Sequence, residues 1–189
     1  VYNPLPEMRF LGKDLGNEPT FLYLSGASYV KGFNVLVKAL ELLGDKRYRV
    51  YMTRTINTDA LPGMLRNKVV TVGEVPYSEL PRLHHGAYAL LFPSIWEEPL
   101  PYVVIESMLM GTLPIASRTG GVPEIVEGSP AQDYLFKSGN EYELADKIEK
   151  IISLGKGDVI EIGHRLREHV LRKFDGNTIK ESLIKVFLG

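Results

Sequence analysis

Short apolar runs alternate with longer amphipathic stretches along most of the chain, and this alternation is typical of repeated strand–helix units. An apolar run bounded by turn residues predicts a strand that is buried on both faces of a parallel sheet. We expect such strands at Phe21–Ser25, Tyr48–Thr53, Val69–Val72, Ala89–Phe92, Leu113–Ser117 and Tyr134–Phe136. The pattern therefore predicts an α/β fold built on a Rossmann-like, doubly wound parallel sheet.

Helical periodicity fills the segments between these strands, and residues that start or stop helices mark their ends. Ser78 is placed as an N-cap, and Gly44, Gly86 and Gly111 each follow a periodic segment as a stop signal. We expect helices at Phe33–Leu43, Ser78–His85, Pro101–Met110 and Pro123–Val126.

From Glu141 onward the pattern is helical, with interruptions near residues 155–157 and 175–176. The last stretch is amphipathic, and its apolar side is formed by Ile179, Leu183, Val186 and Phe187. We therefore divide the chain into a lead-in segment that serves as an interdomain linker (1–19), a Rossmann-like domain (20–154) and C-terminal helices (155–189). The chain opens at Val1 without an initiator Met, which suggests a segment excised or processed from a longer protein.

Composition and charge narrow the class of protein. A chain of 189 residues with 44% hydrophobic and 24% charged residues is an ordinary globular domain. Its net charge of -1 gives no general attraction to nucleic acid or to an anionic membrane. The absence of cysteine excludes disulfides and thiolate chemistry, and together with the lack of a signal peptide or membrane-length apolar run it favours a cytoplasmic location.

The histidines do not have the spacing of a metal site. His84 and His85 are adjacent, and His164 and His169 are five positions apart, so neither pair shares one face of a helix in ligand geometry. Aromatic residues are not clustered with basic ones, as a nucleic-acid platform would require. We expect no metal, no bound cofactor and no nucleic-acid partner.

Three strand-to-helix connections carry the candidate chemistry, because ligands of open parallel sheets bind beyond the carboxyl ends of the strands. They are Ser25–Gly32, Pro93–Pro101 and Ser117–Pro123. In the second, Pro99 favours an extended Glu98 at the mouth of the crevice. Consecutive residues of an extended chain point to opposite sides, so Glu97 and Glu98 are poorly placed as an acid–base pair, and only Glu98 need face the site. A solvated loop carboxylate is the alternative.

Glu106 follows within the predicted helix and is surrounded by apolar residues. A carboxylate in such a position is costly unless it is hydrogen-bonded or paired. The two adjacent hydroxyls of a ribose would satisfy it. A surface-facing Glu106, or one paired with a Lys or Arg, is equally compatible with the spacing.

The other two connections have features of anion or sugar sites. Lys31 and Gly32 precede a helix N-terminus, where a point charge and close backbone approach suit a diphosphate. Gly120 and Gly121 form a turn that exposes backbone N–H groups. A lone surface lysine and a simple strand-to-helix turn are the respective alternatives.

The ordered set of motifs is more specific than any one of them. It comprises Tyr2-Asn3-Pro4, Lys31-Gly32, Pro93-Ser94, Glu98-x7-Glu106, Ser107-Met108, Gly111, Pro114-Ile115-Ala116 and Gly120-Gly121-Val122-Pro123-Glu124. In this order, and over nearly the whole chain, it resembles the C-terminal, donor-binding domain of GT-B fold glycosyltransferases of the large retaining family 4, the glycosyl transferases of group 1. The fold implied is one half of a GT-B enzyme, whose other half binds the acceptor.

The resemblance also implies roles for individual residues. Glu106 would hold the ribose hydroxyls of a UDP-, GDP- or ADP-hexose, and Glu98 the hexose hydroxyls. Lys31 would neutralise the departing pyrophosphate. The donor pocket would also contain Gly32, Pro99, Leu100, Gly120 and Gly121. Such enzymes usually work without a bound metal, and the usual account of retention needs no enzyme nucleophile.

Two positions depart from the family pattern. The family commonly has Gly-Arg before the lysine, with the arginine as a second phosphate ligand, where this chain has Ser25-Gly26. It often has Gly in place of Pro101, which lacks an N–H for the donor. Arg54 and Arg118 are candidates to replace the missing cation.

Alternative functions remain open at this point. They are a non-catalytic or regulatory binding module and a nucleotide-sugar epimerase domain. The full protein's association with a membrane is also open, since many enzymes of this kind act on lipid-linked acceptors. Without an acceptor domain, the isolated chain is expected to bind donor and to transfer little sugar.

Overall fold

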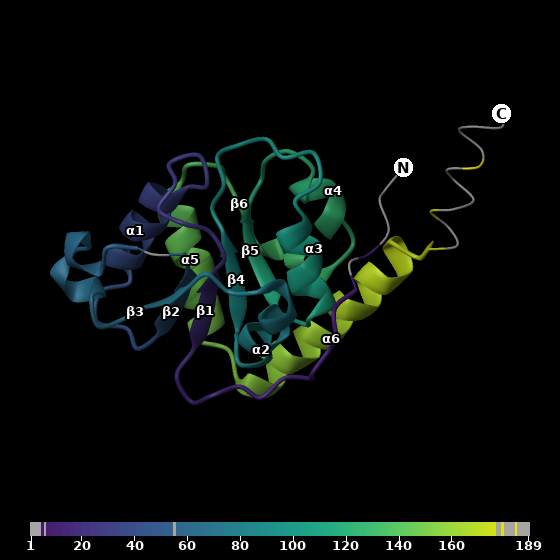
Figure 1. Ribbon diagram of the computed structural model, residues 1–189, viewed down its shortest axis with the longest axis horizontal. Helices are drawn as coiled ribbons and strands as arrows, with labels where there is room; N and C mark the ends of the chain where they lie inside the picture. The colour runs from purple at the N-terminus through teal and green to yellow at the C-terminus, as the bar shows by residue number, and fades with distance from the viewer. Residues whose placement is uncertain (1–4, 6, 55, 177–178, 180–183, 185–189) are drawn as a thin grey trace.

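The computed structural model describes residues 5, 7–54, 56–176, 179 and 184. Within them lies a six-stranded sheet in the order β3-β2-β1-β4-β5-β6 (Figure 1). The strands are β1 (Thr20–Tyr23), β2 (Arg49–Thr53), β3 (Val69–Gly73), β4 (Ala89–Phe92), β5 (Leu113–Ser117) and β6 (Leu135–Phe136). Neighbouring strands are parallel, and the chain winds outward in both directions from the central pair β1 and β4. The predicted doubly wound sheet is thereby confirmed.

Helices cover the sheet. They are α1 (Phe33–Leu42), α2 (Leu80–His85), α3 (Tyr102–Leu109), α4 (Val122–Val126), α5 (Glu141–Ile152) and α6 (Lys156–Lys173). α1 packs against α5, and α3 packs against α6. Because strand–helix–strand crossovers are right-handed, the opposite winding directions put α1 and α3 on opposite faces. None of the helices in the described part of the chain is both long and apolar enough to span a bilayer.

The starts of α3 and α4 differ from the sequence prediction by one residue each, and those of α2 and α6 differ in ways that matter more. Ser78 is not an N-cap: it lies inside a 3-10 turn, Tyr77–Glu79, and α2 begins only at Leu80 with Pro81 in its first turn. The interruption predicted at residues 155–157 lies at residues 153–155 instead. α5 ends at Ile152, and α6 begins at Lys156, so residues 156 and 157 are already helical. Of the apolar side predicted near the end, Ile179 is buried. Leu183, Val186 and Phe187 lie outside the described residues.

Residues 7–19, which we call the strap, contain no helix or strand yet pack on the domain. The Lys13 ammonium donates to the carbonyl oxygens of His84 and Ala87 and to Thr112 Oγ1, the last at 3.0 Å. Burial lowers the pKa of Lys13 to about 7. The Arg167 guanidinium lies 4.4 Å from the centre of the Phe10 ring, and Figure 1 shows the strap running alongside α6. The strap therefore binds to the loop after α2, to the start of β5 and to α6.

Candidate functional site

The three connections predicted to carry the chemistry meet in space. The Ile95 N–H donates to the Val30 carbonyl at 3.0 Å, which joins the loop after β4 to the loop after β1. The Gly121 N–H donates to the Glu98 carbonyl at 2.9 Å, which joins the loop after β5 to the same loop. All three lie at the carboxyl ends of neighbouring strands. The junction of β1 and β4, where the winding direction reverses, is where such sheets bind ligands.

A cavity of about 630 Å³ opens at this junction, and we call it the Lys31 cavity. Its lining comes from the loops after β1, β2 and β4 and from the first residues of α3, and includes Gly26, Lys31, Arg54, Glu98 and Leu100. The first two residues of α3, Tyr102 and Val103, line the cavity, so the positive end of the helix dipole lies beside it. No side chain caps this end of the helix.

Lys31 and Glu98, both in this lining, form an ion pair. The Lys31 side chain is 36% exposed and the Glu98 side chain is 26% exposed, so a ligand can reach both. An ammonium has three N–H donors and a carboxylate has several lone pairs. Each group can therefore keep this contact while it binds a further oxygen or hydroxyl. The neighbouring Glu97 is exposed.

A second cavity, of about 380 Å³, adjoins the first, and we call it the Glu106 cavity. Glu106 lines this cavity and is 9% exposed, so it is not surface-facing. The Tyr77 hydroxyl donates to Glu106 Oε1 at 2.9 Å. Burial raises the pKa of Glu106, and the hydrogen bond from Tyr77 opposes that shift. Burial and the nearby Glu106 carboxylate both raise the pKa of the Tyr77 hydroxyl.

Arg54 lies where the two cavities meet, because it lines both of them together with Leu24 and Val103. Arg118, the other arginine considered from the sequence, lines a separate hollow with residues of β6 and the loop after it. Of these two arginines, the structure thus brings Arg54 alone to Lys31 and Glu106.

The predicted site glycines stand where backbones touch. A Cβ on Gly32 would lie 1.8 Å from the Pro93 carbonyl oxygen, and one on Gly120 would lie 2.2 Å from that of Glu98. A Cβ on Gly121 would lie 2.0 Å from the Pro99 carbonyl oxygen. Only glycine permits these approaches. The three glycines therefore let the neighbouring loops pack against the backbone of the loop that carries Glu98.

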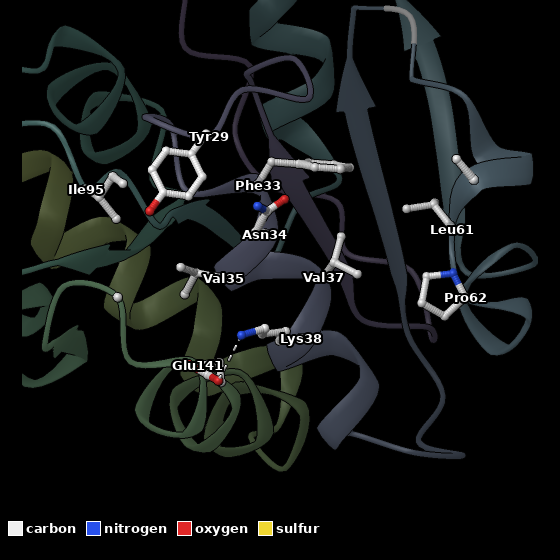
Figure 2. Close-up of a pocket in the computed structure, with 12 residues that line it drawn as sticks. Tyr29, Phe33, Asn34, Val35, Val37, Lys38, Leu61, Pro62, Ile95 and Glu141 are labelled. Carbon is white, nitrogen blue, oxygen red and sulfur yellow. Dashed lines mark ion pairs between the residues drawn. The ribbon is translucent and has the colours of Figure 1, made fainter.

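A third cavity, of about 550 Å³, lies beside α1, and Tyr29 and Ile95 of the loops after β1 and β4 contribute to its lining. Figure 2 shows Tyr29, Phe33 and Val37 around it, and Lys38 of α1 directed toward Glu141 of α5, with which it forms an ion pair at 3.6 Å. Its described lining residues are not shared with the Lys31 or Glu106 cavity. Within the described ranges, no group of three or more His, Asp or Glu side chains is arranged to hold a metal ion.

Comparison with known proteins identifies the family of this chain. Residues 7–169 match the family described as glycosyl transferases group 1. The chain belongs to this family. Among curated members, spore coat protein SA of Bacillus subtilis is 24% identical over 183 residues, which cover 88% of this chain and 48% of that protein. Glycogen synthase of a Marinomonas strain is 30% identical over 152 residues, which cover 75% of this chain and 31% of the synthase.

Solved glycosyltransferase structures share the fold. A glycosyltransferase from Rickettsia africae superimposes with a TM-score of 0.76 at 24% identity, covering 91% of this chain and 48% of that one. Anabaena HepE in complex with UDP and glucose gives a TM-score of 0.74 at 22% identity, covering 90% and 48%. The chain spans about half the length of the first curated relatives it matches, at 48% and 45%. It therefore matches only one part of these relatives.

Sequence reasoning missed two residues of the crevice in this group 1 domain. Tyr77 and Glu74 line the Glu106 cavity. Glu74 directly follows β3, and Tyr77 begins the 3-10 turn four residues after the strand ends. Tyr77 was hidden because its partner Glu106 is 29 positions away in the chain. The rule that directs attention to the carboxyl ends of parallel strands would have found them, had it been applied to β3 as well.

Proposed function

We propose that the Lys31 and Glu106 cavities together bind a nucleotide-sugar donor, and that the whole protein transfers its hexosyl group to an acceptor with retention of configuration. The observation that carries the proposal is the order of groups along the crevice. Glu106 lies at one end, Arg54 in the middle, and Glu98 with Lys31 at the other. A UDP-, GDP- or ADP-hexose has the matching order of ribose hydroxyls, diphosphate and sugar hydroxyls.

Glu106 is suited to the ribose end of the donor. Tyr77 occupies one carboxylate oxygen of Glu106, and the cavity gives a ligand access to the carboxylate. Adjacent ribose hydroxyls are good donors to such a group, and hydrogen bonds to a charged acceptor are stronger than neutral ones. Binding would also offset the cost of burying the carboxylate.

Lys31 and Glu98 are suited to the sugar and phosphate end. Glu98 accepts hydrogen bonds from hexose hydroxyls, and Lys31 stabilises the charge that gathers on the departing diphosphate. The unshielded N-terminus of α3 acts in the same sense. Leu100 lines the same cavity, while Pro99, Gly120 and Gly121 hold the Glu98 loop against the end of β5.

In the transfer step, the bond between the anomeric carbon and the diphosphate oxygen breaks, and the acceptor oxygen bonds to the same face of that carbon. The acceptor proton passes to the leaving diphosphate, which departs as the free nucleoside diphosphate. This front-face route requires no nucleophile from the protein. Glu98 fits a binding role in it, because its carboxylate is neutralised by Lys31.

Calorimetric titration with UDP, GDP and ADP tests the proposal. At least one nucleotide is expected to bind, and Glu106→Ala is expected to weaken it by about ten- to a hundredfold, since a hydrogen bond to a charged group contributes roughly 1.5–3 kcal/mol. Glu97→Ala, which removes an exposed carboxylate next to Glu98, is the matched control.

Two outcomes would contradict the proposal in different ways. Unchanged affinity in Glu106→Ala would show that this residue does not hold the ribose. Absence of binding to all three nucleotides at millimolar concentration would favour a non-catalytic, regulatory module in place of a donor domain.

A further inference from the structure

Of the two cations that line the crevice, one has no carboxylate partner among the described residues. Lys31 and Arg54 are positive, whereas Glu74, Glu98 and Glu106 are negative. Lys31 is paired with Glu98. No described residue forms a salt bridge with Arg54. Two positive and three negative groups give a formal charge of −1, and one positive group with the same three carboxylates would give −2, so loss of Arg54 would make the crevice more repulsive to a diphosphate.

The backbone at Arg54 is held in an unusual conformation. The pairing of β2 with β3 shifts register between Met52 and Thr53, and the Arg54 N–H donates to the Gly73 carbonyl at 2.6 Å. Among the described residues other than glycine, Arg54 alone has a positive φ, at 64°. A side chain larger than hydrogen is disfavoured in this region, and such strain is concentrated at functional sites. The distortion places a long cationic side chain at the carboxyl end of β2, between the two cavities.

Gly26 provides the room for that side chain. A Cβ on Gly26 would lie 3.2 Å from Cδ and 3.7 Å from Cβ of Arg54, so the Arg54 methylene groups extend across the glycine. Gly26 itself lines the Lys31 cavity. The guanidinium is therefore carried from the end of β2 toward the loop that holds Lys31.

We propose that Arg54, reaching across Gly26, is the second cation that binds the diphosphate of the donor. This inference rests on the proposed function of the crevice and adds a phosphate-binding residue on a different strand from Lys31. A guanidinium offers a planar set of N–H donors that matches phosphate oxygens. Its position between Glu106 and Glu98 corresponds to the position of the diphosphate between ribose and hexose.

The test compares nucleoside diphosphate with nucleoside on the same variants. Arg54→Gly removes the cation and relieves the backbone strain, so the variant is expected to be at least as stable as the wild type in thermal unfolding. In calorimetric titration with UDP, GDP or ADP, whichever binds the wild type most tightly, it is expected to lose about tenfold or more of the affinity. Affinity for the corresponding nucleoside is expected to change less than about twofold, because ribose binding at Glu106 is retained.

Two further variants sharpen the result. Arg118→Gly, in the separate hollow beside β6, is the matched control and is expected to leave diphosphate affinity unchanged. In the double variant Arg54→Gly, Gly26→Arg, the new arginine enters the vacated space, and part of the diphosphate affinity is expected to return.

The possible failures are distinguishable. Diphosphate binding that is unchanged in Arg54→Gly, or lost equally for nucleoside and diphosphate, would overturn the role of Arg54 and leave the proposed function standing. A wild type that binds none of the nucleotides would overturn both.

Discussion

His84 is a buried histidine of α2, and Lys13 of the strap donates to its backbone carbonyl oxygen. It is 1% exposed, and both of its ring nitrogens lack a hydrogen-bond partner. Burial, and to a smaller extent the charge of Lys13, lowers its pKa from 6.5 to about 3. The imidazole is therefore neutral in the folded protein at every pH near neutrality, and it acts as a packing group.

We predict that His84 makes the domain sensitive to acid. Between pH 6.5 and about 3 the unfolded chain binds a proton at this residue and the folded chain does not, so the free energy of unfolding falls as the pH falls. The contribution is at most about 1.4 kcal/mol per pH unit. Urea titrations across this range should show a shallower pH dependence for His84→Leu than for the wild type.

The matched control for this prediction is His164→Leu, which makes the same change at an exposed position on α6. It should keep the acid sensitivity of the wild type. Parallel pH profiles for His84→Leu and the wild type would contradict a buried, neutral imidazole.

The identity of the site residues was easier to predict from the sequence than the contacts between them. Lys31, Glu98 and Glu106 could be placed near one another because prolines, glycines and strand ends fix where loops emerge. The ion pair between Lys31 and Glu98 spans 67 positions and has no local signal. From the sequence, Arg54 was only one of two candidate cations. The register shift that precedes it at the end of β2 depends on how β2 pairs with β3, which the sequence does not show.

At the scale of elements, the contact between α3 and α6 depends on two glycines. A Cβ on Gly163 of α6 would lie 2.4 Å from the carbonyl oxygen of Gly111, which follows α3. Arg167, one turn further along α6, donates to the Leu109 carbonyl at 2.7 Å and so satisfies the last turn of α3. The end of the Glu106 helix is thus held by α6.

We predict that Gly163→Ala destabilises the domain by about 1–3 kcal/mol, although alanine is the better helix former, because the added methyl group overpacks this contact. Gly157→Ala in the same helix meets open space and should be neutral or stabilising by up to about 1 kcal/mol. Thermal and urea unfolding of the two variants check the contrast. If the Gly163→Ala and Gly157→Ala variants were equally stable, the prediction would be contradicted. α6 could then shift away from α3 at no cost in stability.

The elements themselves were largely predictable, for a physical reason. Central strands such as β4 and β5 are buried on both faces, so their apolar runs coincide with their boundaries. β1 ends at Tyr23, two residues before the predicted end at Ser25, because the chain leaves the sheet there to form the crevice. The start of α2 was misplaced because Ser78 is a common capping residue, whereas Pro81 was the more informative signal for a first turn.

At the scale of the whole molecule, we predict that these 189 residues bind donor nucleotide but transfer little sugar. The chain spans about half of its first curated relatives, 48% and 45%, and the resemblance to GT-B enzymes implies that another half of the protein binds the acceptor. Free nucleoside diphosphate released from a nucleotide-sugar should be measured with and without the remainder of the protein. Release that needs both the remainder and an acceptor would indicate transfer, and release without acceptor would point to an epimerase-like reaction. Robust transfer by the isolated chain would contradict the prediction.

The strap has a consequence for the order in which the domain folds. Lys13 contacts residues 71 and 99 positions away, and Asn17 contacts Lys156, 139 positions away. Closing such long loops costs entropy, so contacts of this kind form late. The strap precedes the whole sheet in sequence, yet its binding surface exists only after α2, β5 and α6 are in place. It is therefore expected to dock last in folding and to detach first in unfolding.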